Sequence, residues 1–323
     1  MKKLLLKQKQ NHSVVFSNNK TNPINYLNPF AFVAPSYVEQ RMNQPNDVEV
    51  KVTFARLKTF FLSPYGVLGF TFFTLIVLCG LIIPFTTKSP YTISADDAFL
   101  DFGLRGFILG TDRLGRDIWA RTWWGLRNSI GIATAATLAD VLLGVVLGIL
   151  MGYYRFFDRI FNFFIKVLNS VPNIIILILI SIILSANVGS IILGIVLTGW
   201  IGMAQAVRGI VLQVSNQNFI TSSKLLDTPN RSIMMGFIPF LLPTMFSILI
   251  LNVPTALLAD SGLAFLGIVV PNLPTLGSTF NAAISVITIY PQQLLGPVFI
   301  LTFIIFNIRM ISIGFSDAFR SNR

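Results

Sequence analysis

The chain has 323 residues, of which 54% are hydrophobic and 11% are charged, and its mean hydropathy is +0.72. Because soluble domains carry about 25% charged residues, this composition excludes an ordinary soluble domain and predicts a polytopic membrane protein. The net charge of +11 does not indicate a nucleic-acid partner, since nine of the 24 Lys and Arg residues precede residue 60 and no nucleic-acid-binding motif accompanies them; basic residues that orient the chain in a membrane explain the charge better.

Residues 1–63 form a polar cytoplasmic tail that is rich in Asn, Lys and Gln. Toward its end, between Val48 and Phe61, apolar residues recur every three or four positions: Val50, Phe54, Leu57 and Phe61. That spacing predicts an amphipathic helix along the cytoplasmic interface, and a solvated lead-in to the first span is the alternative. The start of the chain is basic but lacks a long apolar core and a small-residue cleavage site, so no cleaved signal is expected.

Six apolar stretches predict six transmembrane helices, because each is near the roughly 20 residues that a hydrocarbon layer of about 30 Å requires. They lie at about residues 66–84, 130–152, 160–184, 189–207, 237–258 and 295–314. The first span and the loop after it occupy residues 64–129. The other five spans form a core at residues 130–323.

The distribution of Lys and Arg predicts the orientation of these spans. The connections at residues 185–190 and 260–293 contain no Lys or Arg. The segments on the opposite side contain nine: Arg155, Arg159, Lys166, Arg208, Lys224, Arg231, Arg309, Arg320 and Arg323. Cytoplasmic segments carry the excess of basic residues, so we expect a multi-pass plasma-membrane protein with both termini in the cytoplasm.

The loop from Phe85 to Ser129 is external by this rule, although it carries Lys88 and five arginines. Five aspartates lie among these cations, so much of the charge is expected to pair within the loop: Asp96, Asp97, Asp101, Asp112 and Asp117.

The same loop contains the stretch Ile108-Leu-Gly-Thr-Asp-Arg-Leu-Gly-Arg-Asp-Ile-Trp-Ala-Arg121. It predicts an interfacial helix that leads into the second span, with Thr111 or Asp112 as its cap. Other side chains are expected to form ion pairs along the helix, namely Arg113, Arg116 and Asp117. The nearby tryptophans suit a membrane interface, namely Trp119, Trp123 and Trp124.

Two acidic residues in or near the predicted spans are candidates for a polar pathway through the membrane. Asp140 lies midway along the second span, where an unpaired charge costs at least about 2.5 kcal/mol, so it must face other helices or a water-filled path. A hydrogen-bonded Asp that joins two helices is the favoured interpretation, because no neighbouring acid or His indicates a proton relay. Asp260 lies at the external end of the fifth span and is expected to cap the helix that follows.

Residues 208–236 form the longest cytoplasmic segment between two predicted spans. Prolines at 229, 239 and 243 mark the turn back into the membrane. Within residues 208–236, the segment from Phe219 to Asp227 mixes apolar side chains with hydroxyl and charged ones at helical spacing. Nine residues of α-helix span about 13 Å, which is too short to cross a bilayer. This pattern predicts a short helix beneath the membrane that fills a groove on a partner.

The sequence offers no chemistry of its own. A phosphate-binding GxxxxGK[ST] loop, paired carboxylates and a nucleophile elbow are all missing from it, so we expect no enzyme activity and no cofactor. A single Cys79 excludes a disulfide framework within the chain, and a single His12 leaves no histidine cluster for a metal.

The stretch before the second span resembles a motif of the C-type permease subunits of oligopeptide and dipeptide transporters of the ATP-binding cassette class. The matching residues are Gly110, Thr111, Asp112, Gly115, Arg116, Asp117, Arg121, Gly125 and Arg127. The match departs from the family at Ala120, where Ser is usual. Similar segments continue downstream through Asn169-Ser-Val-Pro172, the stretch from Asp260 to Gly267, and the C-terminal end, so the resemblance covers about residues 50–323.

This resemblance implies a six-helix permease of the type I importer class. Its expected partners are a homologous B-type permease subunit, two ATP-binding subunits, an external substrate-binding protein, membrane lipid and a peptide substrate. The short helix would then be the coupling helix that contacts an ATPase subunit, made of Phe219, Ile220, Thr221, Ser222, Ser223, Lys224, Leu225, Leu226 and Asp227. Phe219, Leu225 and Leu226 would supply its apolar anchor, with Lys224 at the rim.

The coupling segment departs from the family most, since neither the Glu nor the Gly of the family signature is present and Asp227 stands at the Gly position. Two other functions therefore stay open. An ion-coupled secondary transporter would need broken helices in repeated halves and more intramembrane acids. A membrane assembly protein without transport activity is the other alternative.

Overall fold

The computed structural model describes residues 60–320, which form one unit of the chain. The predicted interfacial helix at residues 48–61 lies almost wholly outside the described residues. Within residues 60–320 the regular structure is helical, with one isolated antiparallel bridge between Thr111 and Asp117. The all-α fold class expected from the composition is therefore confirmed.

Five helices are long and apolar enough to cross a membrane: α4 (Pro64–Thr86), α5 (Ile118–Tyr153), α8 (Val188–Ser215), α11 (Ile238–Phe265) and α13 (Leu295–Arg320). A pair of helices, α6 (Arg155–Asn169) and α7 (Asn173–Ile183), is bent by 90° at its junction and gives a sixth crossing if the two helices form one broken span. Shorter helices connect the spans: α9 (Asn218–Leu225), α10 (Asn230–Gly236), α12 (Leu276–Ile284), and the 3₁₀ turns Ala95–Asp97, Leu104–Gly106 and Pro291–Leu294.

The third predicted span, at residues 160–184, differs from the structure because it is not one continuous helix. The hydroxyl of Ser170 donates to the carbonyl oxygen of Lys166 at 2.8 Å, and α6 ends just before it. Pro172 then lacks a backbone N–H and disfavours helical geometry in the residue before it. The chain therefore turns at residues 170–172 and restarts as α7, with Pro172 at its N-cap.

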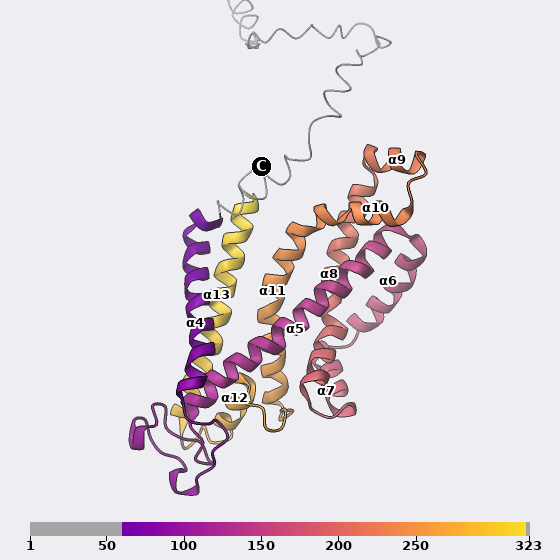
Figure 1. Cartoon of the computed structure of the whole chain (residues 1–323). Coiled ribbons are helices and arrows are strands. Elements are labelled where there is room, and N and C mark those ends of the chain that lie inside the picture. Colours follow the sequence, from indigo (N-terminus) through magenta and orange to yellow (C-terminus); the bar gives the residue numbers. More distant parts are fainter. Residues whose placement is uncertain (1–59, 321–323) are drawn as a thin grey trace, which may run out of the picture. The chain divides into compact units, whose positions relative to one another are not determined.

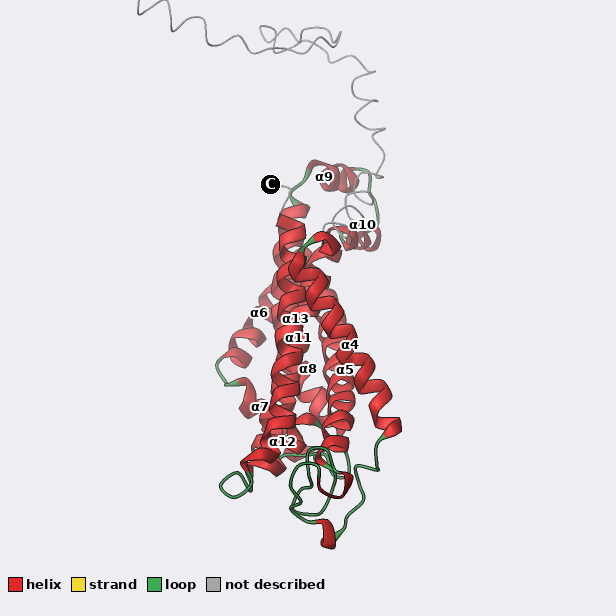
Figure 2. Cartoon of the chain, turned by 90° about the vertical axis from the view of Figure 1, so that its left-hand side faces the viewer, coloured by secondary structure: helices red, strands yellow, loops and turns green. Residues whose placement is uncertain are grey.

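The helix ends fall into two groups, as Figures 1 and 2 show. The start of α4, the end of α13, and both α9 and α10 lie at one end, which is the upper end in these views. The loop after α4 and the short helix α12 lie at the opposite end. This arrangement is the one that six crossings produce, and it places the predicted coupling helix on the same side as the two ends of the described chain.

Helix α5 makes its most extensive contacts with α8. Three glycines spaced four residues apart on α5 let the two backbones approach closely: Gly144 against Met203, Gly148 against Ala204 and Val207, and Gly152 against Val211. Small residues at this spacing are the usual means of close packing between helices in a membrane. Gly144 and Gly148 therefore serve close helix packing, whereas Gly131 and Ala135 lie on the exposed face of α5.

We predict that Gly148→Ala destabilises the protein while Gly131→Ala on the same helix does not. A Cβ at position 148 would lie 2.7 Å from the carbonyl oxygen of Ala204 and from Cβ of Val207. Overpacking of this kind costs about 1–3 kcal/mol. A Cβ at position 131 would meet nothing within 4 Å, and Ala is the better helix former by about 1 kcal/mol.

The measurement is the midpoint of thermal unfolding of the two variants and the parent, purified in the same detergent. A Gly148→Ala midpoint equal to that of Gly131→Ala would contradict the close packing of α5 on α8.

Candidate functional site

Asp112 organises the loop that precedes α5. Its Oδ1 accepts hydrogen bonds from the backbone N–H groups of Leu114 at 2.9 Å and Arg116 at 3.0 Å. Its Oδ2 accepts from Nε of Arg116 at 2.7 Å and forms an ion pair with the same guanidinium. The carboxylate thus closes a tight turn around itself, and the predicted local charge pairing is confirmed for Asp112 and Arg116.

Thr111 ties this turn to two distant parts of the outer end. Its hydroxyl donates to the backbone carbonyl oxygen of Asp97 and accepts from the N–H of Leu100 at 2.8 Å. Its own carbonyl oxygen accepts from Nε2 of the buried Gln293 at 2.9 Å, just before α13 begins. The loop is therefore fastened to the start of the last span.

Asp117 is the residue that caps α5, in place of the expected Thr111 or Asp112. Its Oδ1 accepts from the backbone N–H groups of Trp119 at 2.9 Å and Ala120 at 3.4 Å, and α5 begins at Ile118. Burial raises the pKa of the Asp117 carboxyl, and these two backbone hydrogen bonds lower it. The cap extends the second span twelve residues earlier than the apolar stretch indicated.

The arginines of the motif divide into buried and exposed ones. Arg121 is 7% exposed, and its Nη1 donates to the carbonyl oxygen of Pro90 at 3.3 Å while its Nε lies 3.9 Å from Oδ2 of Asp112. The guanidinium of Arg127 lies over the rings of Phe85 and Trp124. Arg113 is exposed and does not pair along a helix as expected. Trp123 is buried in the core instead of lying at an interface.

Two glycines of the motif adopt backbone geometry that favours glycine. Gly110 and Gly115 have φ values of 71° and 70°, a region that costs other residues about 1–2 kcal/mol. A Cβ on Gly115 would also overlap the carbonyl oxygen of Ser94. A third, Gly125, lies on α5, and a Cβ there would be 2.9 Å from the backbone nitrogen of Leu276. The motif residues therefore lie close together, where they hold the loop before α5 in one conformation and attach it to α5.

The two candidate pathway acids lie in different places, and each is 2% exposed. Asp140 packs against Gly199, where α5 meets α8. Asp260 lies within α11, and its Oδ2 accepts from the hydroxyl of Ser129 at 2.9 Å. The Ser129 oxygen in turn accepts from the N–H of Leu276, the first residue of α12, at 3.0 Å. Asp260 thus reaches the next helix through Ser129 instead of capping it directly. Oδ1 of Asp140 is buried without a hydrogen-bond partner among the described residues, so the expected hydrogen bond to a second helix is not found there.

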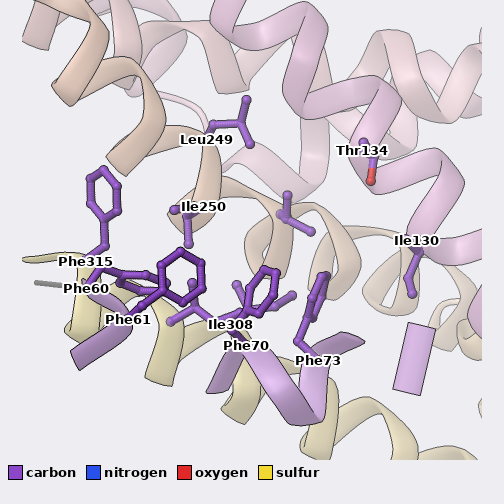
Figure 3. Close-up of a pocket in the computed structure, with 12 residues that line it drawn as sticks. Phe60, Phe61, Phe70, Phe73, Ile130, Thr134, Leu249, Ile250, Ile308 and Phe315 are labelled. Atoms are coloured by element: carbon purple, nitrogen blue, oxygen red, sulfur yellow. The ribbon is translucent and has the colours of Figure 1, made fainter. Parts of the chain in front are cut away.

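Figure 3 shows an apolar pocket between α4, α5, α11 and α13, with a volume of about 430 Å³. Among the described residues, Thr134 is the one polar residue that lines it. Phenylalanines contribute much of its wall: Phe60, Phe61, Phe70, Phe73 and Phe315. Such a lining lacks the charged and hydrogen-bonding groups that a peptide backbone and its termini require. We therefore do not place a peptide site in this pocket.

The predicted coupling segment forms a helix, α9, whose two ends are in contrasting environments. Ile220 is 3% exposed and shares a buried cluster with Val211, Ile233 and Phe237. Leu225 and Leu226 are 81% and 80% exposed. The prediction that Ile220 faces a partner is corrected, because its side chain anchors α9 to the rest of the chain.

Most of the other described side chains of this segment are exposed. Thr221, Ser222, Lys224 and Asp227 are exposed and Ser223 is half-buried, while the side chain of Phe219 lies outside the described part of the chain. Asp227 adopts a φ of 52°. The turn thus needs the left-handed conformation for which glycine is usual, and Asp is one of the few other residues that tolerate it.

The sequence did not identify the ion pair that joins α6 to α8 near α9. Nε and Nη2 of Arg208 donate to the two carboxylate oxygens of Asp158 at 2.5 and 2.9 Å. Each residue was visible as a charge at the edge of a span, but their partnership depends on how the helices pack. The available signal was that Asp158 and Arg208 each lie just beyond a predicted span, on the same side of the membrane as each other.

Residues 141–322 match a family model described as "Binding-protein-dependent transport system inner membrane component". The chain is 31% identical to the oligopeptide transport system permease protein OppC of Bacillus subtilis (strain 168), over 260 residues that cover 78% of this chain and 84% of the relative. The dipeptide transport system permease protein DppC of Lactococcus lactis subsp. cremoris (strain MG1363) is 31% identical over 72% of this chain and 69% of its own length. The DppC of Bacillus subtilis (strain 168) is 32% identical over 49% and 50%.

We predict that Gly115→Ala loosens the outer loop more than Gly103→Ala does. Both glycines have positive φ, 70° and 74°, so both variants carry the same backbone strain. A Cβ at position 103 would meet nothing within 4 Å, whereas one at position 115 would overlap Ser94. The measurement is the rate of tryptic cleavage after the exposed Arg113 in purified protein, which should rise severalfold for Gly115→Ala. Equal cleavage rates in the two variants would contradict the packed loop.

Proposed function

This chain belongs to the family of binding-protein-dependent transport system inner membrane components, and from that membership we propose that it is a permease subunit of an ATP-driven peptide importer. Three relatives named for oligopeptide or dipeptide transport support a peptide substrate. The chain itself would supply half of the translocation pathway. A homologous B-type permease subunit would supply the other half, and an external substrate-binding protein would deliver the peptide.

The exposed leucines of α9 are the observation that carries this proposal. Leu225 and Leu226 are adjacent, and each exposes about four fifths of its surface at the end of the protein where α9 projects. Burying one Leu side chain is worth about 1.5–3 kcal/mol. Two such side chains on a helix too short to cross a bilayer fit a groove on a partner, and an ATPase subunit of the same transporter is the partner we propose.

The anchoring of α9 supports its use as a coupling helix. Because Ile220 is buried against α8, α10 and the start of α11, a displacement of α9 moves these elements with it. In the proposed cycle, ATP-driven closure of the two ATPase subunits displaces α9. The permease subunits then rock between inward-open and outward-open states, and peptide passes between them. ATP hydrolysis takes place in the partner chains.

The charge distribution supports a cytoplasmic position for α9. Arg155, Arg208, Lys224 and Arg231 belong to the segments at the α9 end, whereas the connections at residues 185–190 and 260–293 contain no Lys or Arg. Basic residues concentrate on the cytoplasmic side of membrane proteins. With six crossings, both termini are then cytoplasmic as well.

An ion-coupled secondary transporter receives less support. Its mechanism would need intramembrane acids that face a water-filled site. Asp140 and Asp260, the two acids predicted for the pathway, are instead buried against Gly199 and Ser129.

We predict that the double variant Leu225→Asp and Leu226→Asp loses its ATPase subunits. Removing two leucines that the proposed contact would bury weakens it by at least about 3 kcal/mol, or about 100-fold in affinity. The matched control is Leu225→Met with Leu226→Met, which keeps apolar side chains of similar volume at the same positions. Both double variants leave the internal anchor, Ile220, unchanged.

The measurement is co-purification of the ATPase subunits with the tagged permease, followed by ATP-dependent peptide uptake in proteoliposomes. The Asp variant should lose both, and the Met variant should keep both. Full ATPase binding by the Asp variant, or peptide uptake by this chain without ATPase subunits, would refute the proposed function.

A further inference from the structure

We propose that Tyr153 is a positioning residue that transmits the movement of α9 and α10 to α5, an inference that rests on the proposed function. Tyr153 is the last residue of α5. It contacts side chains from three different elements at the α9 end. The three contacts differ in kind, and together they join the proposed ATPase-facing elements to the longest helix of the described chain.

The first contact is with α10. The hydroxyl of Tyr153 donates to Oδ1 of Asn230 at 2.6 Å. Asn230 is the first residue of α10, directly after the turn that follows α9. This hydrogen bond is exposed to solvent, but it is directional and short, so it constrains the two helix ends relative to each other.

The second and third contacts involve the ring. Nζ of Lys224, on α9, lies 5.3 Å from the centroid of the Tyr153 ring, which is within the range of a cation–π interaction. The ring of Phe237, at the start of α11, lies 6.2 Å from it between centroids. Phe237 is fully buried and shares its cluster with Ile220 of α9. Tyr153 is thus tied to α9 directly and through the core.

The helix that begins at this contact is built to carry a displacement. It contains 36 residues without a proline, which gives a length of about 54 Å. Gly152, next to Tyr153, is packed so closely that a Cβ there would lie 2.6 Å from Cβ of Val211 on α8. The end of α5 therefore moves together with α8 instead of fraying.

The opposite end of α5 is fastened to the outer loop and to α12. Asp117 caps the helix, and Ser129 holds Asp260 and the N–H of Leu276 together. A displacement received at Tyr153 therefore reaches both ends of the permease through one continuous element. Rigid secondary elements of this kind are a physical means of coupling distant sites.

The test uses the assembled transporter in proteoliposomes, with peptide uptake and ATP hydrolysis measured in the same sample. Tyr153→Phe removes the hydroxyl and keeps the ring that Lys224 contacts. We expect assembly and ATP hydrolysis to stay at the parent level, while the amount of peptide transported per ATP falls about three- to tenfold, the effect of one lost hydrogen bond.

Two further variants separate this role from a general loss of stability. Asn230→Ala should give the same fall in peptide per ATP, and the double variant should fall no further than either single one, because both remove the same bond. Tyr154→Phe is the matched control: it keeps the ring that packs against Tyr153 and Phe157, and its loss of a hydroxyl should leave the ratio unchanged.

Three results would overturn the inference. The inference fails if Tyr153→Phe keeps the parent rates of both peptide uptake and ATP hydrolysis. It also fails if uptake and hydrolysis fall by the same factor, because that result indicates a structural role only. A parent transporter that assembles no ATPase or transports no peptide overturns the proposed function itself, and this inference with it. The parent sample therefore distinguishes the two failures.

Discussion

The close packing of α5 on α8 is the constraint on which the rest of the structure depends. Inside a bilayer the hydrophobic effect contributes little to helix association, because lipid already surrounds the apolar side chains. Dispersion contacts between closely approaching backbones therefore hold the helices together. Gly144, Gly148 and Gly152 permit that approach along the inner half of α5. Because α8 leads almost directly into α9, this packing also determines where the exposed leucines project. The position of the proposed ATPase contact is thus set by glycines that lie within the membrane.

Polar interactions serve the two ends of the helix bundle, where they have different tasks. At the outer end, Asp112, Thr111 and Asp117 hold the loop in one conformation through hydrogen bonds to backbone groups. At the α9 end, Asp158 of α6 pairs with Arg208 of α8, and Tyr153 of α5 donates to Asn230 of α10. The outer network stabilises a loop, whereas the inner contacts connect elements that a partner would displace.

The sequence predicted the all-α class and the five membrane-length helices, because the apolar length of a span follows from the bilayer itself. It also predicted the short helix α9 from its mixed apolar and polar spacing, and the coupling function of α9 stays a prediction. It did not predict which of three polar residues caps α5, since Thr111, Asp112 and Asp117 are all good caps and tertiary contacts with Leu100 and Arg116 engage the first two. The bend at residues 170–172 was missed because the apolar stretch continues past Pro172. Ile220 was assigned to the partner-facing side because apolar spacing on a short helix does not distinguish a side chain that binds a partner from one that anchors the helix.

We propose that a separate ATPase subunit binds α9 on the cytoplasmic side. The most direct measurement is site-specific disulfide cross-linking from a cysteine at position 225, in a background where Cys79 is replaced by Ser, to cysteines in the groove of the ATPase subunit. The account predicts a cross-link in the assembled transporter, a yield that changes with bound ATP, and labelling of position 225 only from the cytoplasmic side. Labelling of position 225 by an impermeant reagent added outside the cell, or no cross-link in an active transporter, would contradict it.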